Sequence, residues 1–174
     1  CGVNSYNIGR PLMQMVHFFW TYLRVCEQCG TKPRELTLDL VIPAGALGNA
    51  TAAYMAKKMG LPLGRICLGT NVNDITHRAV TTGEFHRADD MKQTLSEAIN
   101  IQVPYNFERL LYFLSGCDDV LIRTLMTKMD STGKIDLEQD LLEKLQAEFA
   151  SARITDGEMC SAMVNAKEKL GYFM

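Results

Sequence analysis

The chain has 174 residues, of which 47% are hydrophobic and 22% charged, as is usual for a globular protein with one sizeable core. The formal net charge of -2 gives no electrostatic reason to expect nucleic acid or an anionic membrane as a partner. No apolar run approaches the roughly 20 residues that a membrane-spanning helix needs.

The first predicted element is a helix over residues 8–25, where apolar side chains recur at helical spacing and Pro11 fits the first turn. Cys26 and Cys29 follow it with C-x-x-C spacing. No second pair of ligands accompanies them, and a redox pair belongs at the start of a helix, so we expect neither a metal site nor a redox dithiol. The six cysteines lie in apolar or helical surroundings, which predicts reduced thiols and a cytoplasmic protein.

The segment that organises the chain is a buried strand over residues 38–42, a loop with Gly45 and Gly48, and a helix from residue 50 to 59. N–H groups without carbonyl partners point out of such a helix start, together with the positive end of its dipole. This arrangement favours a phosphate site. The alternative is an ordinary strand-to-helix turn capped by Asn49. The loop lacks the lysine of a Walker motif and is shorter than the dinucleotide fingerprint.

A second buried strand, residues 65–69, completes a parallel β-α-β unit. The loops after the two strands, residues 43–48 and 70–73, should face one crevice at the carboxyl edge of the sheet. Asn73 or Asp74 can cap the next helix, which runs to residue 82, and Asp74 is spaced to contact His77. We interpret that pair as structural more often than catalytic.

The segment from residue 84 to 92 is charged and mixed, and we expect a solvated loop there. An apolar stretch within residues 96–105 is typical of a third short strand, ended by Pro104. Helical patterns follow over residues 106–114, 118–128, 137–150 and 155–170. We therefore predict one α/β domain over residues 1–174, with a helical extension from about residue 105 to 174.

Four segments together resemble the threonine synthase family, closest to its threonine synthase-like 2 branch. They are V-N-S-Y-N-I-G-R at residues 3–10, P-A-G-A-L-G-N with A-Y-M-A-K-K-M-G-L-P at residues 43–62, T-N-V-N-D-I-T-H-R at residues 70–78, and I-Q-V-P-Y-N-F-E-R-L at residues 101–110. They occur in the family's order and at about its separations.

This resemblance implies a three-layer α/β enzyme of fold type II that depends on pyridoxal 5'-phosphate. It implies a lyase that eliminates phosphate from O-phosphohomoserine or a similar phosphorylated amino acid, giving threonine after water addition or a 2-oxo acid and ammonia. The resemblance assigns the cofactor phosphate to the backbone N–H groups of Gly45, Ala46, Leu47, Gly48 and Asn49. It places Asn4, Ser5, Asn7 and Arg10 at the substrate cleft, with Arg10 suited to a carboxylate or phosphate.

Two departures qualify this expectation. Ala44 stands where the family has Thr or Ser, and Ala46-Leu47 replaces a pair such as Asn-Phe, so a side-chain hydroxyl contact is lost while backbone donation survives. The family's Schiff-base lysine would lie upstream of residue 3, and a P-H-[ST] segment beyond residue 174. We therefore expect a middle fragment that is inactive alone and works with the remaining segments of the same enzyme. The alternative is a non-catalytic α/β binding module or a degenerate homologue.

Overall fold

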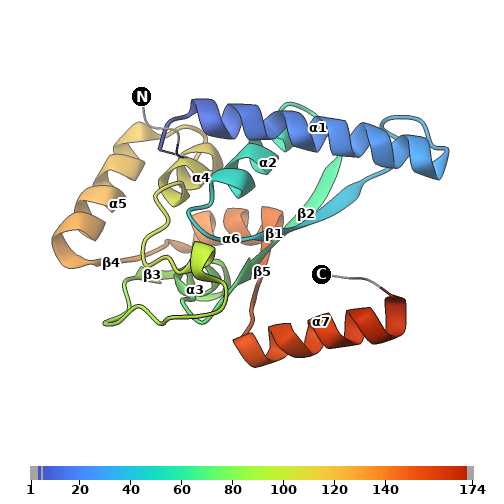
Figure 1. The fold of residues 1–174 in the computed structure, drawn as a ribbon. Helices are drawn as coiled ribbons and strands as arrows, with labels where there is room; N and C mark the ends of the chain where they lie inside the picture. Colours follow the sequence, from blue (N-terminus) through green and yellow to red (C-terminus); the bar gives the residue numbers. More distant parts are fainter. Residues whose placement is uncertain (1–3, 5, 172–174) are drawn as a thin grey trace.

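A parallel sheet with strand order β1-β2-β5 lies at the centre of the computed structural model, which describes residue 4 and residues 6–171. The helices are α1 (Gly9–Cys29), α2 (Gly48–Lys58), α3 (Ile75–Thr82), α4 (Phe107–Leu114), α5 (Asp119–Thr132), α6 (Gln139–Glu148) and α7 (Asp156–Leu170), with a 3₁₀ helix η1 (Glu97–Ile99). The strands are β1 (Leu38–Pro43), β2 (Leu63–Thr70), β3 (Glu84–His86), β4 (Lys134–Asp136) and β5 (Phe149–Arg153) (Figure 1). The predicted α/β class, with helices flanking a parallel sheet, is confirmed.

The predicted β-α-β unit is present. β1 and β2 pair in parallel, with Val41 opposite Cys67 and Ile42 opposite Leu68, and α2 connects them. Because the two strands run in the same direction, their carboxyl ends lie at one edge of the sheet. This is the edge at which the sequence predicts a crevice.

The third strand of the sheet is β5, so the prediction of a strand within residues 96–105 is wrong. That stretch contains η1 and loop, whereas β5 pairs in parallel with β2, with Phe149 opposite Ile66. Residues 149–153 are alanine-rich and continue the helical pattern of α6, so their local pattern does not favour a strand. Their pairing with β2 decides the structure and ends the predicted helix at Glu148.

The segment that begins at residue 84 is not wholly a solvated loop. β3 pairs antiparallel with β4, and Phe85 lies opposite Ile135. Both side chains are buried, with exposed fractions of 2% and 0%, so this small sheet contributes to the core. Three-residue strands are too short to give a readable alternation in the sequence.

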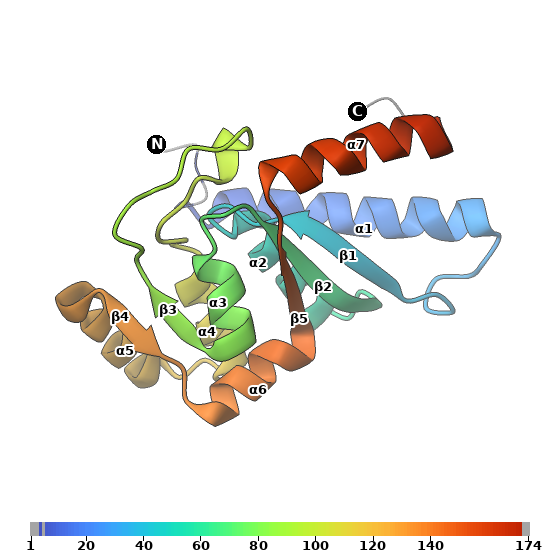
Figure 2. The ribbon, with the colours of Figure 1, turned by 90° about the horizontal axis from the view of Figure 1, so that it is seen from below.

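The two faces of the parallel sheet differ in their cover. Ile66 and Leu68 of β2 are buried, whereas Val41 of β1 points to the other side and is 81% exposed. In Figures 1 and 2, α1 and α2 lie on one side of the sheet and α7 lies on the opposite side. No residue of α7 is buried, so α7 covers its side of the sheet only partly.

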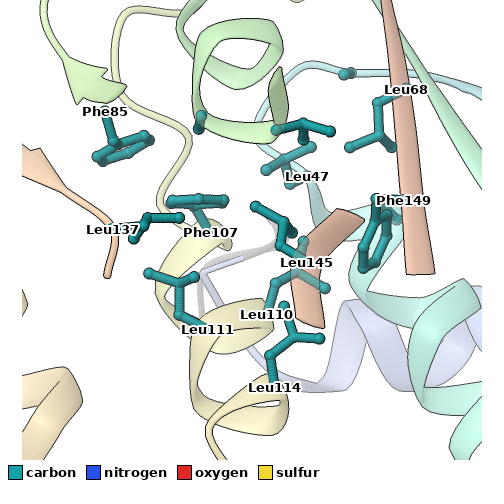
Figure 3. Packing of buried hydrophobic residues seen from close by; sticks show 14 of the residues in the cluster. Leu47, Leu68, Phe85, Phe107, Leu110, Leu111, Leu114, Leu137, Leu145 and Phe149 are labelled. Carbon is teal, nitrogen blue, oxygen red and sulfur yellow. The ribbon is translucent and has the colours of Figure 1, made fainter. Parts of the chain in front are cut away.

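The main core joins the sheet to α2, α3, α4 and α6 (Figure 3). Phe85 and Phe107 stack in it with ring centroids 4.5 Å apart, and Tyr54 packs against Phe149 at 5.5 Å. Leu47, from the loop after β1, is 3% exposed and belongs to this cluster. The core therefore fixes the position of the predicted phosphate loop through a side chain of the loop itself.

α1 continues to Cys29, four residues beyond the predicted end of the helix, so Cys26 and Cys29 lie in its last turns rather than after it. Cys26 is buried and Cys29 exposed, and both are free thiols. The Tyr22 hydroxyl of α1 donates to Leu36 O at 2.8 Å and accepts from Arg34 N at 2.8 Å. Burial raises the pKa of this hydroxyl, which stays protonated and keeps its donor to the loop.

Candidate functional site

The loop between β1 and α2 adopts an uncommon backbone conformation. Leu47 is the N-cap of α2 with φ 62° and ψ 13°, in the left-handed region, and the helix begins at Gly48. Asn49 is therefore the second residue of the helix, and the alternative in which it caps the helix is wrong. A left-handed conformation costs a non-glycine residue roughly 1–2 kcal/mol, and such strain is concentrated at functional sites.

The N–H groups of the loop and of the first turn of α2 have no protein acceptor among the described residues. Before the loop, Ala44 N–H donates to Gly69 O at 2.8 Å, and after it Thr51 N–H donates to Leu47 O at 2.9 Å. Between these two bonds, residues 45–50 donate no backbone hydrogen bond within the described part of the chain. Such a run of main-chain donors at the positive end of a helix dipole is suited to an anion.

Solvent reaches the loop from one side. Asn49 is exposed and Gly45 and Ala46 are half-buried, whereas Gly48 is buried. η1 packs against the loop, because a Cβ added at Gly45 would lie 3.3 Å from both Ala98 O and Ile99 Cγ2. The glycine is therefore needed for the close approach of these two segments.

A network of amide side chains lies at the end of β2, at the same edge of the sheet as the loop after β1. Asn100 Oδ1 accepts from Asn71 Nδ2 at 2.7 Å, from Asn73 Nδ2 at 3.1 Å and from the Thr94 hydroxyl at 2.8 Å. Asn73 also bonds both the N–H and the C=O of Lys92. These contacts hold residues 92–100 against the end of β2.

The predicted contact between Asp74 and His77 does not form. Asp74 instead accepts from Arg78 Nε at 2.9 Å and lies 3.3 Å from Arg153 Nε of β5. His77 Nδ1 lies 2.9 Å from Ser151 Oγ. The prediction failed because Arg78 of α3 itself reaches Asp74, and because β5, which was not predicted, brings Arg153 and Ser151 to the side of α3.

Of the predicted cleft residues, Asn4 and Asn7 lie just before α1 and Arg10 lies in its first turn. Asn4 Oδ1 accepts from Tyr6 N–H at 3.2 Å and Asn7 Oδ1 from Gly9 N–H at 2.9 Å, so both amides support local backbone. Arg10 is exposed, and its guanidinium makes no hydrogen bond or ion pair within the described part of the chain. Ser5 lies outside the described residues.

Two residues that the sequence did not indicate connect the N-terminal turn before α1 to the loop. Asn106 Nδ2 donates to Ala46 O at 2.8 Å, and Arg109 donates both to Asn106 Oδ1 and to Tyr6 O. The N-terminal turn and the loop after β1 are thus joined through α4. The only sequence signal was the position of both residues in the fourth family-like segment, residues 101–110.

A cavity of about 340 Å³ lies at the carboxyl edge of the sheet, between the strand ends and α7. Its lining includes Pro43, Gly69, Asn71, Ile99 and Met159. The capping box of α7 adjoins it, and hydrogen bonds from the N–H and hydroxyl of Thr155 lower the pKa of Glu158. Within the described residues, no His, Cys, Asp and Glu side chains gather as a metal site, and no helix is long and apolar enough to cross a membrane.

Known proteins with similar sequences match this chain over nearly its whole length, and their names agree with one another. Human threonine synthase-like 2 is 37% identical over 172 residues, which are 99% of this chain and 35% of that protein, and the mouse protein is 39% identical over 174 residues. Threonine synthase of Saccharomyces cerevisiae is 32% identical over 90% of this chain and 31% of its own length. No family model matches the chain.

Solved structures agree with these relatives. The pyridoxal-phosphate-bound threonine synthase from Brucella melitensis has a TM-score of 0.92 and 31% identity, over 100% of this chain and 36% of its own. Yeast threonine synthase has a TM-score of 0.87 and 31% identity, over 95% and 34%. The chain thus spans about a third of the length of the relatives that it matches.

Proposed function

We infer that this chain, which belongs to the threonine synthase family, holds the phosphate of pyridoxal 5'-phosphate in an enzyme that eliminates phosphate from a phosphorylated amino acid. The observation that supports this most directly is the run of N–H groups over residues 45–50 without protein acceptors. A phosphate dianion is the ligand class that such a run, at a helix N-terminus, binds best.

The residues present fit the cofactor's phosphate. Gly45, Ala46, Leu47, Gly48 and Asn49 would hold it with main-chain N–H groups, for which the identity of the side chains matters little. Ala44 is 5% exposed and has no hydroxyl, so the donors come from the backbone. When bound, pyridoxal phosphate acts as an electron sink that stabilises negative charge on the substrate carbon next to the amino group.

We propose that the substrate is O-phosphohomoserine or a similar phosphorylated amino acid. Arg10 supports this assignment, because its exposed guanidinium can bind a carboxylate or phosphate through two parallel hydrogen bonds. Asn4, Ser5 and Asn7 would lie near it at the cleft. After the loss of phosphate, two products are open. Addition of water gives threonine, and elimination without it gives a 2-oxo acid and ammonia.

We propose that residues 1–174 form one cofactor-phosphate domain whose partners are the remaining segments of the same enzyme. The family's cofactor-bound lysine would come from one of those segments, so the chain alone should bind phosphate without catalysing elimination. The free thiols of Cys26, Cys29 and Cys67 support a cytoplasmic enzyme.

Titration of the ¹⁵N-labelled chain with inorganic phosphate, pyridoxal phosphate and pyridoxal tests this function. We expect saturable shifts of the backbone amides of residues 45–50 with the two phosphate-bearing ligands, and none there with pyridoxal. Equal shifts with pyridoxal, or no shift at residues 45–50, would contradict the proposal and favour a binding module without a cofactor. In the parent enzyme, release of phosphate from O-phosphohomoserine separates an active lyase from a degenerate homologue.

A further inference from the structure

Asn106 is a fully buried polar residue, 0% exposed, directly beneath the loop after β1. It is the N-cap of α4, yet its side chain makes no capping hydrogen bond. Its Nδ2 donates instead to Ala46 O at 2.8 Å, and its own backbone N–H donates to the same oxygen at 3.2 Å. Two donors of one residue therefore converge on one carbonyl of the loop.

These two hydrogen bonds to the Ala46 carbonyl oxygen set the direction of the next N–H group of the loop, that of Leu47. The chain contains no cis peptide among its described residues, so the Ala46–Leu47 peptide is trans and planar. In a trans peptide the C=O and the following N–H point in opposite directions. Because Ala46 O is held toward α4, the Leu47 N–H is directed away from α4, and it has no acceptor among the described residues.

We propose that Asn106 is a positioning residue for the phosphate site: it holds the Ala46–Leu47 peptide in the orientation that lets the loop bind an anion. The inference rests on the proposed function and adds a residue 60 positions from the loop. The left-handed backbone of Leu47 makes such a hold necessary, because a non-glycine residue leaves that conformation when its neighbours do not maintain it.

Arg109 extends the same contact to the candidate substrate cleft. One guanidinium nitrogen donates to Asn106 Oδ1 and another donates to Tyr6 O at 2.5 Å. With Nδ2 as donor and Oδ1 as acceptor, the orientation of the Asn106 amide is determined at both ends. An aspartate in its place would keep the contact with Arg109 and put a carboxylate oxygen against the Ala46 carbonyl, which repels it.

The test compares Asn106→Ala and Asn106→Asp with the unchanged 174-residue chain. Leu114→Val is the control, because Leu114 is buried at the opposite end of α4. Its replacement by valine should lower the stability of the helix without changing a contact of the loop. The first readout, without ligand, is the ¹⁵N order parameter of the Ala46 and Leu47 amides. We expect it to fall in both Asn106 variants and to stay unchanged in Leu114→Val.

The second readout is the affinity for inorganic phosphate, followed at the Leu47 amide. We expect about a tenfold loss in Asn106→Ala, a larger loss in Asn106→Asp, and the unchanged affinity in Leu114→Val. If the Asn106→Ala chain does not fold, the isosteric Asn106→Asp variant decides alone. Unchanged order and affinity in the Asn106 variants, or an equal loss in Leu114→Val, would overturn the positioning role. If the unchanged chain binds no phosphate while the variants still lose order at Leu47, Asn106 holds the Ala46–Leu47 peptide as argued and the proposed phosphate site fails.

Discussion

Replacement of Leu47 by alanine and by glycine tests the conformation on which the anion site depends. At most positions glycine is less stable than alanine, by roughly 0.5–1 kcal/mol, because it loses more backbone entropy on folding. Leu47 has φ 62°, where alanine is strained and glycine is not. We therefore expect the ordinary order of stability to be inverted at this position.

The structure allows both effects to be estimated. Leu47 is 3% exposed within the main core, so truncation to alanine should lower the free energy of unfolding by about 2–5 kcal/mol. Relief of the left-handed strain is worth roughly 1–2 kcal/mol, and the entropy of glycine offsets about half of it. Leu47→Gly should thus be more stable than Leu47→Ala by about 0.5–1 kcal/mol.

Urea denaturation of the unchanged chain, Leu47→Ala and Leu47→Gly measures these differences in the free energy of unfolding. Arg34 is the positive control, because it is exposed with φ 77°, so Arg34→Gly should also exceed Arg34→Ala in stability. Ala53 is the opposite control: it is buried inside α2, and Ala53→Gly should cost about 1 kcal/mol. A Leu47→Ala chain that is more stable than Leu47→Gly would refute the left-handed conformation and, with it, the directed N–H groups of the loop.

Three further outcomes follow from single contacts. Because the pKa of Glu158 is lowered in the folded chain, its carboxylate stabilises α7 fully above the pKa of an unfolded glutamate. This stabilisation disappears as the pH falls through the lower pKa of the folded state. The protection of α7 amides from hydrogen exchange should therefore fall with acid in the unchanged chain and lose this acid dependence in Glu158→Gln. A Cβ at Gly64 would clash with Asp39 Oδ1, which accepts from Arg65 N–H, so Gly64→Ala should lower the free energy of unfolding by about 1 kcal/mol in urea denaturation. No loss would show that Asp39 is free to move. Val41 is 81% exposed, so Val41→Lys should change the stability of this chain by less than about 0.5 kcal/mol, and a larger loss would mean that this face of the sheet is covered.

The parts of the fold that the sequence predicts are those with local signals. The β-α-β unit has two apolar runs, a glycine loop and a helix that ends near Gly60, and each of these lies within a few residues of its cause. β5 has no such signal, since Phe149 and its alanine neighbours fit the end of a helix as well as a strand. Pairing with the edge of β2 makes these residues a strand, and each paired residue of β2 lies 83 positions away in the sequence.

The candidate site divides in the same way. The place of the loop was predictable, because an apolar run precedes Gly45 and Gly48 and a helical pattern follows them, and its use as an anion site stays a prediction. The contacts that hold the loop were not, because Asn106 and Ala46 are 60 residues apart and an asparagine before a helix is ordinarily a cap. Asp74 shows the converse error, since a plausible local partner, His77, was outweighed by Arg78 and Arg153.

The loop is held from three directions before any ligand arrives. The Leu47 side chain is buried in the core, Asn106 bonds the Ala46 carbonyl, and η1 packs against Gly45. Donors that are already oriented lose little freedom on binding and need little reorganisation when charge develops nearby. For this reason the replacement of family side chains by Ala44, Ala46 and Leu47 does not by itself argue for a degenerate homologue: the donors belong to the backbone, and the contacts that orient them are present.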